Sequence, residues 1–316
     1  MDEFALIQNY FASRTLSRSD VIVGSGDDCA IVTVPSSQQL AISIDTLISG
    51  VHFPINTAPY DIGYKSLAVN LSDLAAMGAE PAWVTMSLSL VEANTDWLEN
   101  FAQGFFKLAQ QFNTQLIGGD ITRGPVLNIT IQVHGFVPPN KAILRTGAKV
   151  GDVIYVTGSL GDAGLALQCI KQNKEIPEQL LNRLNKPQPR INEGIALREI
   201  VHSAIDISDG LIADLGHILE KSVVGATIDT SKIPLSHYLQ EMTDFNHAIK
   251  LALTAGDDYE LCFTVAKENE KKLNQLMNKI GCEIHKIGVI EQQCGLRILN
   301  KDGSVYKLNE TGYKHF

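Results

Sequence analysis

Aspartates stand beside glycine or other small residues at five separate places in this chain. The five stretches are GDDCA (residues 26–30), SIDT (43–46), NLSDLAAMGAEP (70–81), GGD (118–120) and DISDG (206–210). Each lies where a predicted strand or helix begins or ends. Converging carboxylates bind hard cations, and Mg²⁺ held in this way usually carries the phosphates of a substrate. The pattern therefore favours a fold that gathers several element ends around a metal–phosphate site.

The bulk composition excludes some classes of protein. A chain of 316 residues is long enough for one large or two medium domains, and its net charge of −9 argues against non-specific nucleic-acid binding. The five cysteines include no CxxC pair, which predicts reduced thiols in a cytosolic protein. The N-terminus lacks the features of a signal peptide, and no apolar run is long enough to span a bilayer. We expect a cytoplasmic protein without membrane or nucleic-acid partners.

The first half of the sequence mixes predicted strands and helices. Helices are predicted over residues 3–11, 61–77 and 96–110, and strands over 29–33, 39–45, 81–90, 115–117 and 126–137. In the 39–45 strand, the period of two puts Ser43 and Asp45 on one face and the aliphatic residues on the other. Asn70 and Asp73 are three residues apart on a predicted helix, so they share a face.

The second half follows a turn-rich junction at residues 138–140. Strands are predicted over residues 152–157, 203–207, 226–229 and 260–265, with a helix over 211–221, another near Leu235, two helices around a proline-broken loop at 186–189, and a final helix–strand pair. We expect a mixed α/β (α+β) protein with domains at 1–139 and 140–316 that build a site between them.

Several motifs have a structural explanation as well as a functional one. The chain has no GxxxxGK[ST] loop, so a nucleotide would not be bound by a P-loop. The GSLGDAG stretch at 158–164 fits a tight turn into a helix better than a dinucleotide motif, although that helix N-terminus could face an anion. Asp28 could be a solvated turn residue and Asp209 a helix N-cap. Asp206 lies between two isoleucines, and a buried carboxylate needs a partner or a metal.

The remaining candidate site residues also have both a functional and a structural explanation. The two glycines before Asp120 would let backbone N–H groups approach a phosphate, but this stretch could also be a loop with a capping aspartate. His52 is a lone histidine, and such residues are more often structural than catalytic. Arg145 could clamp a phosphate or form a surface salt bridge. Only the motifs taken together therefore favour a metal–phosphate site.

A longer set of segments carries a family resemblance. They are GDDCA, SIDTLISGVHF, KSLAVNLSDLAAMGAEP, GGDITRG, SAIDISDGLIADLGH, GDDYELCF and GYKHF, in this order from about Asp20 to Phe316. The chain resembles the thiamine-monophosphate kinases, a family in the aminoimidazole ribonucleotide synthetase-like superfamily. The resemblance implies an N-terminal ATP- and Mg²⁺-binding domain whose sheet pairs across a homodimer, and a C-terminal α/β domain that closes the active site. The implied reaction is transfer of the γ-phosphoryl group of ATP to thiamine monophosphate, which gives thiamine diphosphate.

The resemblance also implies site residues, position by position. The Mg²⁺ ligands would be Asp28, Ser43, Ile44, Asp45, Asp73, Asp120, Asp206 and Asp209, with Ile44 contributing its backbone carbonyl where relatives often carry threonine. ATP would contact Gly119, Asp120, Arg145 and Ser208. Thiamine monophosphate would contact His52, Asp257 and Tyr313. Asp257 stands where a glutamate is expected.

The acceptor in this reaction would be a phosphate monoester, which is largely dianionic at neutral pH because its second pKa is near ~6. We therefore expect no catalytic general base, and several Mg²⁺ ions that neutralise and align the two polyanions. One alternative is another ATP-dependent synthetase or dehydratase of the superfamily, although the first twenty residues and the C-terminus lack the cysteine of two such branches. The other is a non-catalytic Mg²⁺- or nucleotide-binding regulator.

Overall fold

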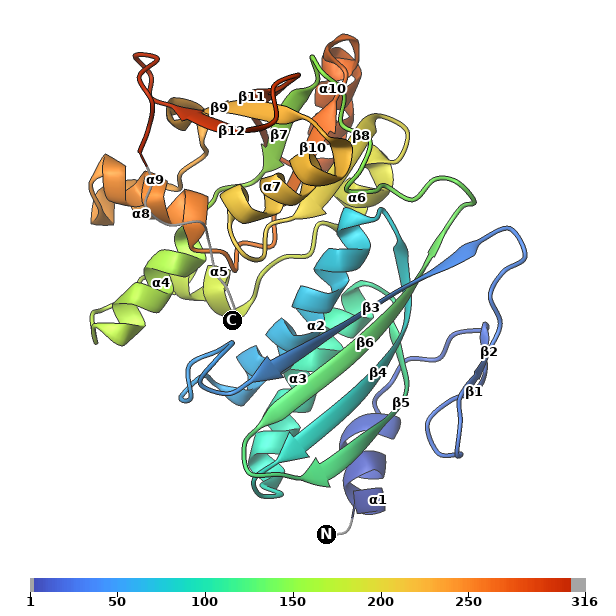
Figure 1. The fold of residues 1–316 in the computed structure, drawn as a ribbon. Coiled ribbons are helices and arrows are strands. Elements are labelled where there is room, and N and C mark those ends of the chain that lie inside the picture. Colours follow the sequence, from blue (N-terminus) through green and yellow to red (C-terminus); the bar gives the residue numbers. More distant parts are fainter. Residues whose placement is uncertain (1–2, 308–316) are drawn as a thin grey trace. The chain divides into compact units, whose positions relative to one another are not determined.

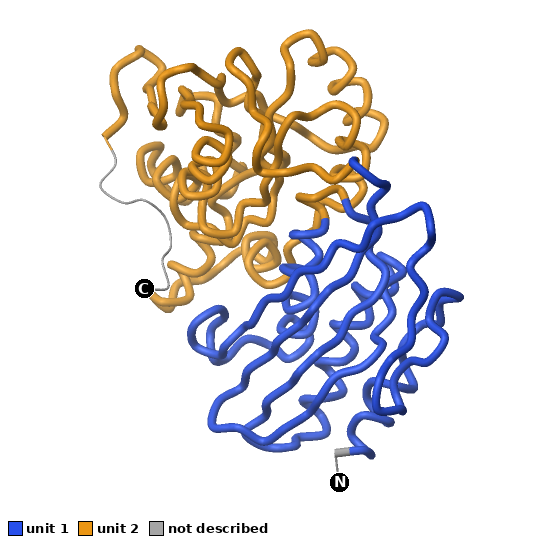
Figure 2. The backbone as a smooth tube through the Cα atoms, turned by 45° about the vertical axis from the view of Figure 1, so that its right-hand side comes forward, with its two compact units in different colours: residues 1–74, 79–140 blue, residues 75–78, 141–316 orange. Residues whose placement is uncertain are grey.

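Residues 3–307, which the computed structural model describes, divide into two units by their contacts (Figure 2). Of the described residues, 3–74 and 79–140 form unit 1, and 75–78 and 141–307 form unit 2. The chain passes from unit 1 to unit 2 at Asn140, directly after the two prolines of the predicted junction. Among the described residues, no helix has the length and apolar character needed to cross a membrane.

Unit 1 is built on a four-stranded sheet in the order β3-β6-β4-β5 (Figure 1). Its strands are β3 (Gln39–Ile48), β4 (Glu80–Leu90), β5 (Gln115–Arg123) and β6 (Asn128–Val137). Strand β6 is antiparallel to both neighbours, whereas β4 and β5 are parallel. The parallel pair is joined by helix α3 (Thr95–Gln111), as parallel strands require a crossover connection.

Helices α2 (Pro59–Ala76) and α3 cover one face of this sheet (Figure 1). They cross closely at two glycines: a Cβ on Gly63 would lie 2.0 Å from the carbonyl oxygen of Phe101, and one on Gly104 would lie 1.9 Å from that of Tyr60. Helix α3 buries Phe101 and Phe105 beneath the sheet. Its N-cap is Asn94, whose side chain accepts the N–H of Trp97.

The N-terminal segment runs along the β5 side of unit 1. It forms α1 (Glu3–Leu6), a π-helical turn η1 (Ile7–Ala12), and a small hairpin of β1 (Val21–Val23) and β2 (Ile31–Val32). Phe11 packs against Phe101 and Phe106 of α3. The strand predicted over residues 29–33 is only the two residues of β2, because its partner β1 has only three residues and the residues before β2 form a turn.

Unit 2 contains a six-stranded sheet in the order β12-β9-β11-β7-β10-β8. The strands are β7 (Val153–Thr157), β8 (Val201–Asp206), β9 (Gly225–Asp229), β10 (Leu261–Val265), β11 (Ile284–Glu291) and β12 (Gly295–Leu299). Only the β12–β9 pair is parallel. The predicted strands at 152–157, 203–207, 226–229 and 260–265 correspond to β7, β8, β9 and β10.

Helices pack on this sheet and bury its core. They are α4 (Asp162–Lys171), α5 (Glu178–Asn185), α6 (Ile191–Leu197), α7 (Leu211–Ser222), α8 (His237–Met242), α9 (Phe245–Thr254) and α10 (Glu270–Ile280), with 3-10 turns η2 (Thr230–Lys232) and η3 (Lys267–Asn269). Apolar residues of α7 and α9 share one core with β7, β8 and β10. The helix predicted near Leu235 begins only at His237, because Ser236 caps α8 by accepting the N–H of Leu239.

Candidate functional site

Two of the predicted ligand segments meet on the helix-covered face of unit 1. The hydroxyl of Ser43 on β3 donates to Oδ2 of Asp73 on α2, at 2.5 Å. The N–H of Asp45 donates to Oδ1 of the buried Asn70, at 3.0 Å. The alternation predicted for β3 is confirmed, since the Ile44 side chain lies on the opposite face and is 57% exposed.

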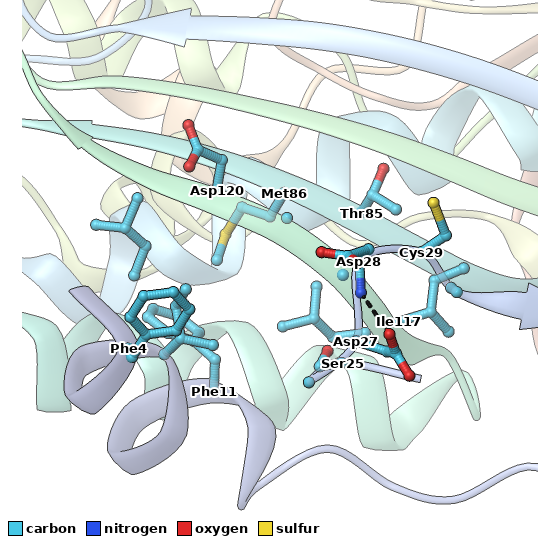
Figure 3. A pocket seen from close by; sticks show the side chains of 17 residues that line it. Phe4, Phe11, Ser25, Asp27, Asp28, Cys29, Thr85, Met86, Ile117 and Asp120 are labelled. Atoms are coloured by element: carbon cyan, nitrogen blue, oxygen red, sulfur yellow. Dashed lines mark hydrogen bonds between the residues drawn. The ribbon is translucent and has the colours of Figure 1, made fainter. Parts of the chain in front are cut away.

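Two other predicted ligands line a cavity of about 530 Å³ in unit 1 (Figure 3). Asp120 reaches it from β5 and Asp28 from the loop before β2, while Phe4 and Phe11 line it from the N-terminal helical segment. The neighbouring Asp27 also lines it, and its Oδ1 accepts the N–H of Asp28 at 2.8 Å. The described lining residues include three carboxylates and no lysine or arginine.

The glycine before Asp120 is required by the sheet itself. A Cβ on Gly119 would lie 1.9 Å from the carbonyl oxygen of Met86 on the adjacent strand β4, so any larger residue would separate β4 from β5. Asp120 is in register with Ser87. Its side chain is exposed, and the sequence alternative of a loop with a capping aspartate is wrong because residues 115–123 are strand.

His52 has a local structural contact in the turn after β3. Its Nδ1 accepts the N–H of Ile48 at 2.9 Å, which closes the turn. The acceptor role of Nδ1 leaves Nε2 to carry the proton of a neutral ring. His52 is half-buried, so the turn presents the ring partly to solvent.

In unit 2, the DISDG loop links β8 to α7. Asp206 is 4% exposed at the end of β8, whereas Ser208 is exposed and Asp209 is half-buried. The alternative of Asp209 as a helix cap is wrong: the N-cap of α7 is Gly210, and no side chain caps it. Instead, Oδ2 of Asp214 accepts the N–H groups of Ser208, Asp209 and Gly210. Burial and the charge of Asp209 raise the pKa of Asp214 to about 7, although these three N–H groups oppose the shift.

The GDDYE segment lies directly against the DISDG loop. The N–H of Asp257 donates to the carbonyl of Ser208, and the N–H of Tyr259 to that of Ile207, both at 2.8 Å. Asp257 and Tyr259 have φ values of 62° and 51°, which are unusual for residues other than glycine. Aspartate adopts this conformation more readily than most residues, which suits position 257. The structure therefore brings Ser208 and Asp257 together.

Among the described residues, no side-chain hydrogen bond or ion pair joins Arg145 to another predicted site residue. Arg145 is exposed on the segment before β7, where its carbonyl accepts the hydroxyl of Ser222 at 3.5 Å. Tyr313 lies outside the described residues.

The sequence reasoning missed three buried acids beside the predicted site residues. Asp214 lies beneath the DISDG loop, and Asp258 accepts the N–H of Gly161 at 3.0 Å and 3.1 Å. Glu260 is held by Arg183 and Arg190. Burial raises the pKa of Asp258 well above its usual value. The acidic residues within GDDYE and DISDGLIAD were the sequence signal that could have indicated these buried acids. The group that faces the helix N-terminus after GSLG is the carboxyl of Asp258.

The donor chemistry of these residues suits Mg²⁺. Carboxylates and hydroxyls are hard oxygen ligands, which Mg²⁺ prefers. Within residues 3–307, however, no three or more His, Cys, Asp or Glu side chains are clustered closely enough to hold a metal ion by themselves. A cation at these sites would therefore need further ligands, such as water or substrate phosphates.

All five cysteines are free thiols.

Comparison with known proteins identifies the class. The family models of the AIR synthase related protein match this chain in order, the N-terminal domain at residues 26–137 and the C-terminal domain at residues 149–299. The chain thus has the two-domain AIR synthase related fold, as predicted.

Closer relatives narrow the class to one family. The thiamine-monophosphate kinase of Escherichia coli K12 is 46% identical, and the alignment covers 99% of this chain and 98% of that protein. A crystal structure of the thiamine-monophosphate kinase of Stenotrophomonas maltophilia K279a is 45% identical with a TM-score of 0.89, covering 97% of this chain and 98% of that one. The structure of AaThiL complexed with AMPPCP and TMP is 31% identical with a TM-score of 0.78, covering 90% and 89%. This chain belongs to the thiamine-monophosphate kinase family.

Proposed function

We infer that this chain is a thiamine-phosphate kinase, which transfers the γ-phosphoryl group of ATP to thiamine monophosphate and releases thiamine diphosphate and ADP. The observation that carries the inference is identity of 46% to a thiamine-monophosphate kinase over essentially the full length of both chains. The complex of AaThiL with an ATP analogue and TMP supports the same substrate pair. The reaction belongs to thiamine diphosphate biosynthesis, and we place it in the cytoplasm.

The acidic cavity supports a role for divalent cations in this reaction. Three carboxylates and no basic side chain, among the described residues, line a space of about 530 Å³. ATP and a phosphate monoester are both polyanions, so such a wall would repel them unless cations intervened. Bound Mg²⁺ would neutralise the phosphates and hold them in line, which is the main contribution to phosphoryl transfer. No general base is required because the acceptor is already an anion.

We assign the Mg²⁺ ligands to three groups of residues. Asp28 and Asp120 line the cavity, Ser43, Asp45 and Asp73 lie where β3 meets α2, and Asp206 and Asp209 flank the loop before α7. The backbone carbonyl of Ile44, the residue between Ser43 and Asp45 on β3, is also part of the proposed ligand set.

The two substrates would then be bound by different residues. Gly119, Asp120, Arg145 and Ser208 contact ATP in this proposal. His52, Asp257 and Tyr313 contact thiamine monophosphate. The carboxylate of Asp257 suits a cationic thiazolium or an aminopyrimidine, both of which pair well with an anion. Its φ of 62° is a conformation that aspartate adopts more readily than most residues.

The exposed face of the unit 1 sheet supports a homodimer. Leu40, Ile42 and Ile44 project from edge strand β3 and are 37%, 56% and 57% exposed. An apolar stripe on a sheet edge is an unfavourable surface for a monomer and a natural site for self-pairing. Sedimentation velocity should show a dimer, and Ile44→Glu should shift it to monomer. Val305→Glu should not, although Val305, in unit 2, is 68% exposed. A monomeric wild type would contradict the proposal.

The activity is tested by the release of ADP with different acceptors. With Mg²⁺ and ATP, we expect rapid release with thiamine monophosphate and little with free thiamine or with no acceptor. ADP release that is independent of any thiamine compound would favour another ATP-dependent enzyme of the superfamily. Nucleotide binding without ADP release would favour a regulator.

A further inference from the structure

Three successive backbone N–H groups before α7 point at one internal carboxylate. Asp214 is 3% exposed, and its Oδ2 accepts the N–H groups of Ser208, Asp209 and Gly210, each at 3.1 Å. Consecutive N–H groups at a helix N-terminus ordinarily form a concave site for an anion, which in many proteins is a phosphate. In this chain the group that occupies this position is the carboxyl of a side chain of the helix itself.

Carbonyl groups of the same loop are engaged as well. That of Ser208 accepts the N–H of Asp257 at 2.8 Å, and that of Gly210 accepts the N–H of Asp214 at 3.0 Å. A main chain bonded in this way cannot turn toward a ligand without breaking those hydrogen bonds. What the loop presents at its surface is therefore the exposed hydroxyl of Ser208 and the half-buried carboxylate of Asp209.

We propose that Asp214 is a positioning residue that makes this loop a cation-binding loop rather than a phosphate-binding one. It fills the anion site formed by the loop N–H groups and thereby directs the carboxylate of Asp209 toward a divalent cation. The inference rests on the proposed function, in which Asp209 is a Mg²⁺ ligand. Removing a group that orients a metal ligand typically weakens metal binding by about 10- to 100-fold.

The test measures Mn²⁺ binding to the full chain by electron paramagnetic resonance, with a non-hydrolysable ATP analogue present. Asp214→Ala should weaken Mn²⁺ binding by about tenfold or more. Added formate should restore much of the loss, because it fits the space of the missing carboxylate and can accept the same N–H groups. Formate should not change Mn²⁺ binding to the wild type. A general loss of stability would not respond to formate.

Three further variants make the result decisive. Asp214→Asn keeps one acceptor oxygen and should bind Mn²⁺ with intermediate affinity. Asp162→Asn changes a buried carboxyl at the start of α4 that accepts the hydroxyls of Ser159 and Ser236, and it should lower thermal stability without changing Mn²⁺ affinity. Asp209→Ala tests the proposed ligand directly and should weaken Mn²⁺ binding.

The possible failures are distinguishable. Wild-type Mn²⁺ affinity in Asp209→Ala would overturn the metal role of this loop, and with it the proposed ligand set. Weak binding in Asp209→Ala together with wild-type affinity in both Asp214 variants would overturn the positioning role alone. If Asp214→Ala does not fold, wild-type affinity in Asp214→Asn overturns it.

Discussion

Replacing Glu260 with glutamine should destabilise the protein by about 3 kcal/mol. The carboxylate is 1% exposed and accepts from Arg190 at 2.6 Å and 2.7 Å, from Arg183 at 2.9 Å and from Thr157 at 2.5 Å. Glutamine keeps the shape but removes the charge that both guanidinium groups share, which leaves Arg183 with Asp162 at 3.8 Å and Arg190 with Glu193 at 3.4 Å. Breaking a buried ion pair costs about 3–5 kcal/mol, and the lower end applies because each arginine side chain retains about a fifth of its exposure.

The measurement is urea unfolding followed by circular dichroism, since Trp83 and Trp97 both lie in unit 1 and fluorescence would report that unit alone. Glu199→Gln is the matched control. Glu199 pairs with Lys141 at 2.9 Å, but the two side chains are 62% and 45% exposed, so the loss should be at most about 1 kcal/mol. Equal losses for Glu260→Gln and Glu199→Gln would refute the reasoning.

The difference in stability between wild type and Glu260→Gln should also depend on pH. Burial alone would raise the pKa of Glu260, but Arg190, then Arg183 and Thr157, outweigh burial and lower it. A lowered pKa means that the ionised carboxylate stabilises the fold above its ordinary pKa of about 4.3, and that this contribution is lost as the pH falls through the folded-state value. The stability gap between wild type and Glu260→Gln should therefore shrink below about pH 4. A gap that stays constant down to acid unfolding would contradict this assignment.

The remaining predictions concern one strained residue and the proposed site. Val223 follows α7 with a φ of 56°, which is strained for valine, so Val223→Gly should stabilise the protein by about 1 kcal/mol in thermal unfolding. Gly281 occupies the equivalent position after α10, so Gly281→Ala should destabilise the protein by a similar amount. Asp73→Asn and Asp206→Asn should each remove most turnover with an unchanged circular dichroism spectrum, because a lost ligand charge costs several kcal/mol of transition-state stabilisation. Asp257→Ala should raise KM for thiamine monophosphate more than KM for ATP in steady-state kinetics.

Each of these predictions has a result that would contradict it. A destabilised Val223→Gly would mean that packing of the valine outweighs its backbone strain. Near wild-type turnover of both asparagine variants at saturating Mg²⁺ would remove Asp73 and Asp206 from the ligand set. A rise in KM for ATP alone would assign Asp257 to the nucleotide.

Local sequence patterns predicted the helices and strands of unit 1 and much of the grouping of its candidate ligand residues. Period-two alternation placed Ser43 and Asp45 on one face of β3, and helical spacing placed Asn70 and Asp73 together on α2; the structure pairs these two sets. Such periodicities depend on backbone geometry alone, so they can be recognised without knowing the tertiary fold.

The contacts between distant loops could not be predicted in the same way. The pairing of Asp257 with Ser208 depends on β10 lying beside β8, and the role of Asp214 depends on a turn that points three N–H groups at one side chain. The positive φ of Asp257 likewise results from this packing. The three aspartates in DISDGLIAD look alike in sequence, although Asp206 and Asp214 are buried and Asp209 is half-buried.

The central claim is tested most directly by following the phosphoryl group itself. The protein would be incubated with Mg²⁺, thiamine monophosphate and ATP labelled only in its γ-phosphate, and the thiamine products separated by chromatography. We predict that the label appears in thiamine diphosphate in equal amounts with the ADP formed. Label released only as inorganic phosphate, or transferred to free thiamine in preference to thiamine monophosphate, would contradict the account.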